Sequence, residues 1–347
     1  MDVAIVGFGT VGQGVAESIE MKNRLFVDRF GDGIRIVAAF DSISYAISKK
    51  GLNPTDLVKM KVGKGNVGKK RPETIPEMLA NLDYDVLVEM TPTNIVDAKP
   101  GIDHIKAALN AGRDVVTSNK GPLALKFREI SKLANKNKCN LRFEASVGGA
   151  TPVINLASEL LRCEKIASIR GIMNGTCNYI LSRMESEGLP WEPALREAQQ
   201  LGYAEADPSY DIDGIDTACK VAILANAIMG NDVTVHDVER TGIRGVNLEA
   251  VTLAAQDKKV IRLIGEITEK GVEVAPRLIP RGHPLSISGT LNTFHIQTDL
   301  AGEIIVAGRG AGRRETASAV MSDLWAIMRS RAQLAQQLNT GRNIVSD

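Results

Sequence analysis

Cysteine is scarce in this 347-residue chain, and its spacing excludes two common uses of the residue. None of the four cysteines forms a CxxC pair, and none has a histidine at the spacing of a metal site. Neither a zinc site nor a disulfide framework is therefore indicated, and we expect reduced thiols. The four residues are Cys139, Cys163, Cys177 and Cys219.

Long apolar runs and an excess of one charge are also missing. No stretch of about 18 consecutive apolar residues occurs, so we expect no membrane span. The chain passes from Met1 almost directly into an apolar run at 3–6, without the basic segment and cleavage pattern of a signal peptide. With 42 basic and 41 acidic residues, the net charge of +1 provides no field that would recruit nucleic acid or an anionic membrane. We expect a cytoplasmic protein that recognises a small molecule locally.

The length predicts two domains, because a domain usually spans roughly 100 to 200 residues. Residues 1–145 alternate short apolar runs with amphipathic segments, a pattern typical of strand–helix units around a parallel sheet. We expect strands at 3–6, 35–40, 85–89, 114–117 and 140–144, and helices at 11–21, 102–110 and 123–135. The first domain is therefore predicted to be a doubly wound α/β domain.

From residue 146 the pattern changes to that of an α+β domain, which we expect to extend to residue 307. Thr151-Pro152 indicates a helix start, with threonine as the N-cap. Further helices are expected at 177–187, 192–201 and 215–229, and strands at 165–173, 261–267, 272–278 and 294–298. A glycine-rich turn at 308–312 precedes a helical pattern at 316–328, so residues 308–347 are expected to fold back onto the first domain.

The clearest motif is a GxGxxG loop that follows the first strand and opens a helix. In that context it is typical of dinucleotide binding by a Rossmann-type domain. The first glycine permits a tight turn, the second lets the backbone approach the pyrophosphate, and the third lets helix and strand pack closely. The free amides at the helix N-terminus attract the diphosphate. The predicted cofactor-binding residues are Gly7, Phe8, Gly9, Thr10, Val11 and Gly12.

The end of the second strand bears on the choice between NAD and NADP. Asp41 could bind the adenosine ribose hydroxyls and repel a 2'-phosphate, which favours NAD, although it could also be a simple turn residue. Ser42, Lys49 and Lys50 could accept a phosphate, so both cofactors stay open. The glycine- and lysine-rich segment 61–76 lacks GxxxxGK[ST] and is interpreted as a mobile surface loop.

Two further candidates follow the third and fourth predicted strands, at the sheet edge where ligands bind in open α/β sheets. Thr91 follows the third strand as a cofactor contact. Lys120 follows the fourth and could face the nicotinamide, the substrate carbonyl or both, although a lysine after a strand is often simply solvated.

Residues 202–220 carry five carboxylates and no cation before Lys220. Such crowding is unfavourable unless something positive binds among them. An EF-hand is excluded, because the glycine and glutamate that it needs at positions 6 and 12 are absent. The α-ammonium of an amino acid is a better candidate, since carboxylates hold it by charge-assisted hydrogen bonds. The five are Glu205, Asp207, Asp211, Asp213 and Asp216.

Asp216 and Lys220 are four residues apart on a predicted helix and therefore share a face. One interpretation is an ordinary helical ion pair. The other is catalytic, because a lysine can donate a proton to a carbonyl oxygen as hydride arrives at its carbon. Burial or a second cation such as Lys120 would lower its pKa for that role. Both interpretations fit the sequence.

The chain resembles the homoserine dehydrogenase family. The pattern that carries the resemblance is Ala198-x3-Gly202-Tyr-Ala-x2-Asp207-Pro-x2-Asp211-Ile-x-Gly214-x-Asp216-x3-Lys220. The glycine loop and four further segments agree, namely 117–120, 144–149, 174–179 and 310–312. We expect neither the regulatory ACT domain nor the aspartate kinase that some members carry.

The resemblance implies reversible reduction of L-aspartate 4-semialdehyde to L-homoserine with NAD or NADP, on the route to threonine and methionine. It implies that Lys220, Lys120 and Asp216 are catalytic, with Lys220 as general acid/base, although either lysine could donate the proton. It also implies that Asp216, Glu205 and Lys120 hold the substrate. The other residues implied at the substrate are Asp211, Thr176, Gly175 and Tyr203, and those at the nicotinamide end of the cofactor are Gly202 and Gly310.

The resemblance also implies a structural monovalent cation, sodium, held by Glu144 and the backbone of Val147, Gly149 and Thr151. It further implies a homodimer formed through the second domain. Two other functions stay open. A semialdehyde-oxidising dehydrogenase would need a nucleophilic cysteine, for which Cys177 and Cys219 are the candidates. A regulator that senses NAD(P) without turnover would need neither the lysines nor the acidic stretch.

Overall fold

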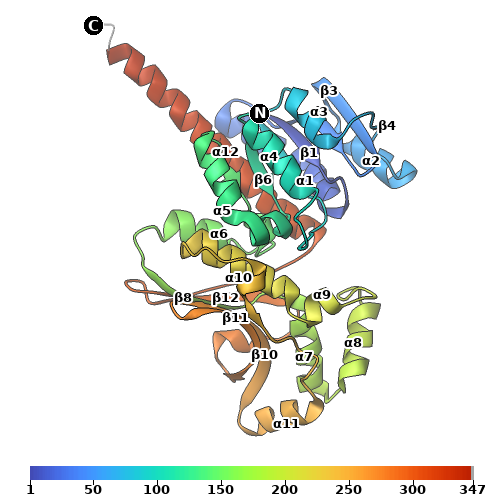
Figure 1. The fold of residues 1–347 in the computed structure, drawn as a ribbon, viewed down its shortest axis with the longest axis vertical. Coiled ribbons are helices and arrows are strands. Elements are labelled where there is room, and N and C mark those ends of the chain that lie inside the picture. The colour runs from blue at the N-terminus through green and yellow to red at the C-terminus, as the bar shows by residue number, and fades with distance from the viewer. Residues whose placement is uncertain (345–347) are drawn as a thin grey trace. The chain divides into compact units, whose positions relative to one another are not determined.

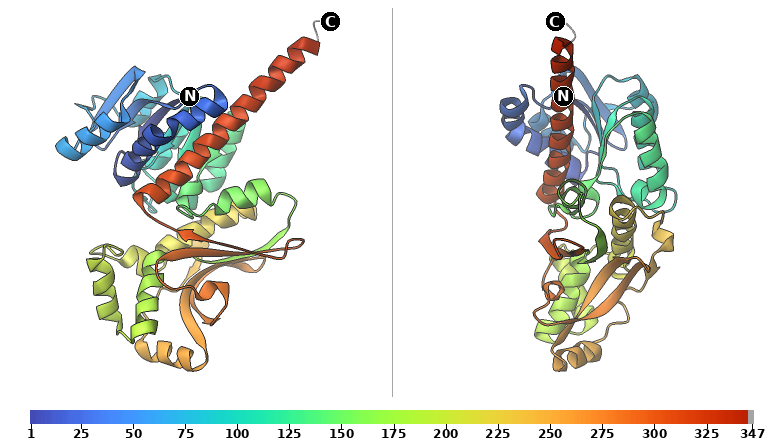
Figure 2. Two further views of the ribbon diagram at one scale, coloured as in Figure 1. Left: turned by 180° about the vertical axis from the view of Figure 1, so that it is seen from behind. Right: turned by 90° about the vertical axis from the view of Figure 1, so that its left-hand side faces the viewer.

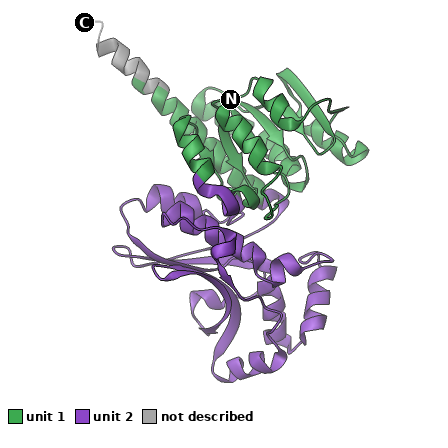
Figure 3. Ribbon diagram, viewed as in Figure 1, with its two compact units in different colours: residues 1–122, 129–145, 316–347 green, residues 123–128, 146–315 purple. Residues whose placement is uncertain are grey.

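The computed structural model describes residues 1–344, with the side chains of residues 335, 336 and 338–344 left out of the description. Residues 345–347, the end of the segment expected to fold back, lie outside the described residues. The chain forms two compact units (Figure 3). Unit 1 contains Met1–Pro122, Glu129–Ala145 and the chain from Thr316, and unit 2 contains Leu123–Arg128 and Ser146–Glu315. Every helix among the described residues is too short or too polar to cross a membrane.

Unit 1 is built on a seven-stranded sheet in the order β4-β3-β2-β1-β5-β6-β7 (Figure 1). Its parallel strands are β1 (Asp2–Val6), β2 (Arg35–Phe40), β5 (Val86–Glu89), β6 (Asp114–Thr117) and β7 (Leu141–Arg142). The central strands are continuous apolar runs because helices cover both faces of such a sheet. The predicted doubly wound α/β fold is confirmed.

The last helix completes the core of unit 1. From Thr316 onwards, α12 (Arg313–Ile344) belongs to this unit, and Figure 2 shows it in red beside α1 (Thr10–Phe30) in dark blue. Trp325 packs edge-on against Phe26 and Phe30 of α1, with ring centroids 5.1 and 4.7 Å apart. Further helices include α4 (Gly101–Asn110), which packs against β5 and β6, and α5 (Lys120–Lys136), of which residues 123–128 belong to unit 2.

The structure corrects the expected mobile loop at 61–76. This segment contains the end of α2 (Pro54–Lys64), the strand β4 (Lys69–Lys70) and the start of α3 (Ile75–Asn81). Together with β3 (Ser44–Leu52), β4 extends the sheet by antiparallel pairing. Local caps hold the helices, because Asn53 accepts from the backbone N–H of Asp56 at 2.9 Å and Thr74 forms a capping box with Glu77.

Unit 2 contains a six-stranded sheet in the order β13-β12-β8-β10-β11-β9, with helices packed against it. All neighbouring strands are antiparallel except β11 and β9. The strands are β8 (Ile166–Ile172), β9 (Glu239–Arg240), β10 (Lys259–Thr268), β11 (Gly271–Pro280), β12 (Leu291–Thr298) and β13 (Glu303–Arg309). The expected α+β architecture is confirmed.

The helices of unit 2 include α7 (Gly175–Glu187), α8 (Trp191–Gln200), α9 (Ser209–Ile212), α10 (Ile215–Ile228) and α11 (Leu248–Gln256). In α10 every residue from Asp216 to Asn226 is buried. A helix that is buried on all sides must find partners inside the protein for each polar side chain that it carries.

Three expected boundaries were wrong. The strand predicted at 140–144 is reduced to β7, and Glu144 begins a 3₁₀-helix (Glu144–Ser146). Pro152, not Thr151, is the N-cap of α6 (Val153–Asn155), which passes into a π-helix (Leu156–Leu160). The expected glycine turn at 308–312 starts inside β13, because its first residues pair with β12.

Candidate active site

Three glycines shape the loop between β1 and α1 in different ways. Gly7 has a φ of +95°, and a Cβ there would lie 2.4 Å from the carbonyl carbon of Met90. A Cβ on Gly12 would lie 2.4 Å from the Gly7 oxygen. Gly9 is the N-cap of α1 without a side-chain cap, and a Cβ there would meet no atom within 4 Å. Gly7 and Gly12 therefore allow strand and helix to approach, and Gly9 leaves the helix N-terminus accessible to an anion.

This loop borders a cavity of about 1200 Å³ in unit 1. The ends of β2 and β5 form other parts of its wall. Of the predicted cofactor residues, those that line it are Gly7, Phe8, Gly9, Thr10, Val11, Asp41 and Thr91. Gly12 packs behind the loop, and Lys120 starts α5 outside the lining.

The carboxylate of Asp41 is buried and already engaged by protein donors. Its Oδ1 accepts from the backbone N–H groups of Ile43 and Ser44, at 2.9 and 2.6 Å, and from the Ser44 hydroxyl at 2.8 Å. Its Oδ2 accepts from Lys61 Nζ at 2.8 Å. Burial opposes ionisation, but these hydrogen bonds prevail and hold the pKa of Asp41 below its ordinary value. Lys61 thus balances the charge that was expected to repel a 2'-phosphate.

Two cations beside Asp41 were missed by the sequence analysis. Lys61 and Arg71 line the cavity, and Arg71 donates through Nη2 to the Ser42 carbonyl at 2.6 Å. The lysines that had been considered, Lys49 and Lys50, are exposed on β3 and do not line it. A two-residue strand such as β4 has no periodicity from which its pairing could be predicted.

A buried carboxylate organises the ends of β5 and β6. Glu89 is fully buried, and its Oε1 accepts from the backbone N–H of Thr91 at 3.1 Å and from the Thr91 hydroxyl. The hydroxyl of Thr117 donates to Oε2 at 3.2 Å. Asn119 in turn donates through Nδ2 to Thr91 Oγ1 at 3.1 Å. Asn119 is also the N-cap of α5, so this network fixes the position at which the helix of Lys120 begins.

In unit 2, Lys220 and Asp216 form a buried ion pair on α10. Lys220 Nζ donates to Asp216 Oδ2 at 2.6 Å and to the carbonyl oxygen of Met173 at 2.6 Å. The two side chains are only 9% and 8% exposed. The pair therefore differs from a solvated ion pair on a helix surface, which contributes only about 0.3 to 0.5 kcal/mol to stability.

Asn174 joins this pair to a second carboxylate. Its Nδ2 donates to Asp211 Oδ1 at 2.7 Å and to Asp216 Oδ2 at 3.0 Å. Its Oδ1 accepts from the backbone N–H of Cys177 at 2.9 Å, which makes it the N-cap of α7. Burial and the negative charge of Asp216 raise the pKa of Asp211. No role was predicted for Asn174 from the sequence, although an asparagine before a helical pattern is an N-cap signal.

The expectation that a bound cation must balance the whole acidic stretch was wrong for two of its members. Asp213 forms an ion pair with Arg244, and Asp207 accepts from the backbone N–H of Ser209 at 3.0 Å. Hydrogen bonds from Ser209 lower the pKa of Asp207. Glu205 is exposed in the loop between α8 and α9.

The other predicted substrate residues lie at the start of α7 and in the loop after α8. Gly175 is the first residue of α7, and the hydroxyl of Thr176 donates to the carbonyl oxygen of Tyr203 at 2.6 Å. Gly202 has a φ of +75°, a backbone conformation that favours glycine. The ring of Tyr203 lies 4.9 Å from that of Tyr179. Thr176 thus holds the loop that carries Tyr203.

The residues predicted to bind a monovalent cation divide between the units. Glu144 is buried in unit 1, whereas Val147, Gly149 and Thr151 belong to unit 2. In unit 2, Gly149 has a φ of +58°, and a Cβ there would lie 2.4 Å from the Gly310 oxygen. The hydroxyl of Thr151 is buried without a hydrogen-bond partner. No cluster of three or more His, Cys, Asp or Glu side chains able to hold a metal occurs among the described residues.

The two candidate nucleophiles, Cys177 and Cys219, lie in the interior of the protein. Cys177 and Cys219 are fully buried. Burial and the neighbouring Asp211 raise the pKa of Cys177 well above its ordinary value, and its Sγ donates to the Asp211 carbonyl at 3.2 Å. A buried thiol of this kind is inert, because the thiolate is the reactive form.

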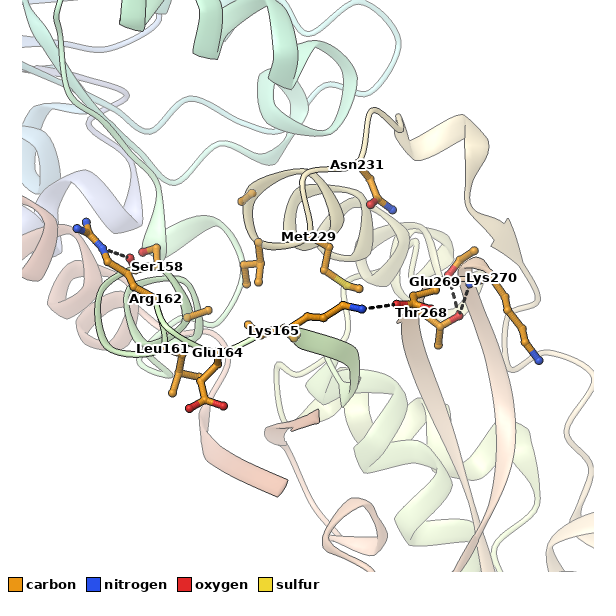
Figure 4. A pocket seen from close by; sticks show the side chains of 15 residues that line it. Ser158, Leu161, Arg162, Glu164, Lys165, Met229, Asn231, Thr268, Glu269 and Lys270 are labelled. Atoms are coloured by element: carbon orange, nitrogen blue, oxygen red, sulfur yellow. Dashed lines mark hydrogen bonds and ion pairs between the residues drawn. The ribbon is translucent and has the colours of Figure 1, made fainter. Parts of the chain in front are cut away.

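A second cavity, of about 610 Å³, lies on the surface of unit 2 (Figure 4). Lys165 extends across it toward Glu269, with 3.3 Å between Nζ and Oε1. Arg162 turns away and donates to the Ser158 carbonyl at 2.7 Å. None of the titratable side chains in its lining is buried, so this cavity lacks the features of an active site.

Two family profiles and several relatives match most of the chain. The profile described as "Homoserine dehydrogenase, NAD binding domain" matches residues 7–144, and that described as "Homoserine dehydrogenase" matches residues 152–325. A homoserine dehydrogenase of Methanocaldococcus jannaschii is 46% identical over 93% of this chain and 97% of its own length. An NAD(+)-dependent homoserine dehydrogenase of Pseudomonas canavaninivorans is 37% identical over 93% and 94%.

Solved structures give the same result. A putative homoserine dehydrogenase of Archaeoglobus fulgidus superposes with a TM-score of 0.88, at 47% identity, over 94% of this chain and 99% of that one. A hyperthermophilic archaeal homoserine dehydrogenase in complex with NADPH has a TM-score of 0.80, at 31% identity, over 93% and 96%. Both the profile matches and these identities over most of the chain show that it belongs to the homoserine dehydrogenase family.

Proposed function

We propose that this protein interconverts L-homoserine and L-aspartate 4-semialdehyde with a nicotinamide cofactor, a step in the synthesis of threonine and methionine. The single observation that carries the proposal is the buried Lys220, held by Asp216 and the Met173 carbonyl on a helix of unit 2. The glycine loop and the cavity of unit 1 support the use of a dinucleotide.

Lys220 is proposed to move the proton of the reaction. When homoserine is oxidised, its C4 hydroxyl gives its proton to the neutral amine of Lys220 as the C4 hydride leaves. A nicotinamide cofactor bound at the glycine loop would supply the hydride acceptor, or the hydride donor in the reverse direction. In the reverse direction the Lys220 ammonium donates its proton to the aldehyde oxygen. Asp216 orients the amine and stabilises the ammonium, and general acid–base catalysis of this kind contributes about 10² to 10⁴ in rate.

Asp211 and Glu205 are proposed to hold the α-ammonium of the substrate. The raised pKa of Asp211 supports this role, because a bound cation would relieve the repulsion between Asp211 and Asp216. Following the family resemblance, we assign Gly175, Thr176 and Tyr203 to the substrate pocket. Lys120 is assigned to the substrate or the nicotinamide. Gly202 and Gly310 are assigned to the nicotinamide end of the cofactor.

We propose that both NADP and NAD are accepted, with Lys61 and Arg71 binding a 2'-phosphate. Their place in the wall of the cavity beside Asp41 supports this assignment. Replacing Arg71 by alanine is expected to raise the KM for NADP and leave that for NAD nearly unchanged. Equal changes in both KM values would contradict the assignment.

We also propose that sodium binds Glu144 and the backbone of Val147 and Gly149, with Thr151, as structural support. The family resemblance assigns the backbone of Thr151 to this ion, and its buried hydroxyl without a hydrogen-bond partner supports a ligand beside that backbone. Sodium chloride should then raise the Tm more than choline chloride at equal ionic strength, and Glu144→Gln should abolish the difference. An equal effect of the two salts on the wild type would contradict the proposal.

The protein is proposed to act as a cytoplasmic homodimer. Its four free cysteines support a reducing compartment. The position of β13 at the edge of the unit 2 sheet, with Ile305 45% exposed, supports association through this unit. Light scattering after gel filtration should give twice the chain mass, and a monomer at micromolar concentration would refute this proposal.

The direct test of the activity is to mix the purified protein with L-homoserine and either NAD or NADP at alkaline pH. We expect the absorbance of the reduced nicotinamide to rise with at least one cofactor. No signal with either cofactor would refute the proposed function and favour a regulator that senses NAD(P) without turnover.

A further inference from the structure

We propose that Asn174 is a positioning residue for this reaction, and that its side-chain amide fixes Asp216 and thereby Lys220. The inference rests on the proposed role of Lys220. Asn174 lies at the junction of β8 and α7 and is 5% exposed. The preceding residue, Met173, supplies the carbonyl oxygen that accepts from Lys220. Two consecutive residues therefore hold Lys220, one directly and the other through its carboxylate partner.

Both hydrogens and the oxygen of the Asn174 side-chain amide have hydrogen-bond partners. Its nitrogen has two hydrogens, and these meet Asp211 Oδ1 at 2.7 Å and Asp216 Oδ2 at 3.0 Å. Its oxygen accepts from the Cys177 backbone N–H at 2.9 Å. A flipped amide would turn its oxygen toward two carboxylates and its nitrogen toward an N–H group. The orientation of the amide is thus determined by three contacts, and the position of Asp216 follows from it.

A neutral donor suits this place for an electrostatic reason. Asp211 and Asp216 are like charges in a buried cluster, and the charge of Asp216 contributes to the raised pKa of Asp211. The amide satisfies both carboxylates without adding charge. Asp216 Oδ2 consequently receives two donors, Asn174 and Lys220, which define its direction on α10.

The Met173 carbonyl is held from a second side. Asn292, on β12, donates through Nδ2 to this oxygen at 3.2 Å and is 1% exposed. The carbonyl that accepts from Lys220 is therefore anchored to the sheet of unit 2. Asn174 provides the matching anchor for the carboxylate, so the Nζ atom has fixed partners on both sides.

The test uses Asn174→Asp, which separates capping from positioning. A carboxylate can still accept from the Cys177 N–H, so α7 keeps its cap. An ionised carboxylate cannot donate to Asp211 or Asp216, and it adds a third negative charge beside them. We expect kcat for homoserine oxidation to fall by about 100-fold, because a small displacement of a catalytic group has an effect of that size.

Two further readouts distinguish positioning from a general structural defect. The pH at which kcat rises should shift upward, because the added negative charge favours the ammonium form of Lys220 over the amine that oxidation needs. The KM for the cofactor should stay close to that of the wild type. Because the added charge alone can move the pH profile, Asn174→Ser, which adds no charge, should also lose kcat while its cofactor KM stays unchanged.

A matched control is Asn247→Asp. Asn247 caps α11 in the same way, since its Oδ1 accepts from the Ala250 backbone N–H at 2.8 Å, but it is exposed and lies outside the carboxylate cluster. This variant should have wild-type kcat and pH profile. Thermal unfolding of both variants should show Tm values within a few degrees of the wild type.

The proposal is overturned if Asn174→Asp retains kcat within about threefold of the wild type with an unshifted pH profile. If Asn174→Asp does not fold, the test uses Asn174→Ser, which keeps a hydrogen-bond acceptor for the cap of α7 and adds no charge. A wild-type kcat in Asn174→Ser would also overturn the proposal. If the proposed role of Lys220 is wrong, the result is different: Lys220→Met remains active, whatever the effect of the Asn174 substitutions.

Discussion

The buried Lys220–Asp216 pair makes a strong prediction about stability. Replacing Lys220 by methionine keeps the length of the side chain but leaves Asp216 buried without its ionic partner. The two side chains are only 9% and 8% exposed. The free energy of unfolding should therefore fall by about 3 to 5 kcal/mol, as is usual when one partner of a buried ion pair is removed. In a unit of this size each kcal/mol lowers the Tm by about 2 to 4 °C, so we expect a drop of roughly 6 to 20 °C.

The assay is thermal unfolding followed by circular dichroism at neutral pH, for Lys220→Met, for Asp216→Asn and for the double variant. The double variant removes both charges, so it should regain most of the lost stability. The two changes should therefore be coupled by about 2 kcal/mol or more. Additive effects of the two substitutions, or an unchanged Tm for Lys220→Met, would refute the reasoning that this pair is buried and energetically coupled.

Three other predictions concern different parts of the molecule. Gly7→Ala should destabilise unit 1, because its Cβ would overlap the backbone of Met90 and Thr91, just after β5. Gly9→Ala should fold normally and raise the cofactor KM, and equal Tm values for the two variants would contradict this. Burial opposes ionisation of Asp85, but hydrogen bonds and the charge of Arg331 lower its pKa below the ordinary 3.8. The ionised Asp85 therefore stabilises the fold fully above pH 3.8, and this stabilisation is lost as the pH falls through the lowered pKa. Arg331→Met should therefore unfold at a higher pH than the wild type in an acid titration, and an unchanged midpoint would refute the assignment. Cys177→Ser should keep kcat within about threefold, since a nucleophilic role would abolish turnover.

The parallel core of unit 1 could be predicted from the sequence because its strands are buried on both faces and appear as continuous apolar runs. The structure of residues 44–81 could not be predicted from the sequence, for a physical reason. Strand β3 has no regular alternation, and β4 has two residues, so their antiparallel pairing depends on tertiary context. This is also why Lys61 and Arg71 were not found as neighbours of Asp41.

The catalytic candidates were predictable only where they share a helix. The four-residue spacing of Asp216 and Lys220 places both on one face of α10, and the structure shows them in contact. Their other partners come from the junction of β8 and α7, more than forty residues earlier in the chain. No local pattern predicts such an approach. Similarly, the partner of Asp213 was missed because Arg244 lies beyond α10.

The central claim is that Lys220 moves the proton during hydride transfer, and one measurement tests it most directly. The rate of cofactor reduction by L-homoserine should be compared between the wild type and Lys220→Met at a temperature where both are folded, with cofactor binding measured in parallel. We predict a loss of at least about 100-fold in kcat with nearly unchanged cofactor affinity, as expected when an acid–base group is removed. A variant that turns over homoserine within a few-fold of the wild-type rate would contradict the account.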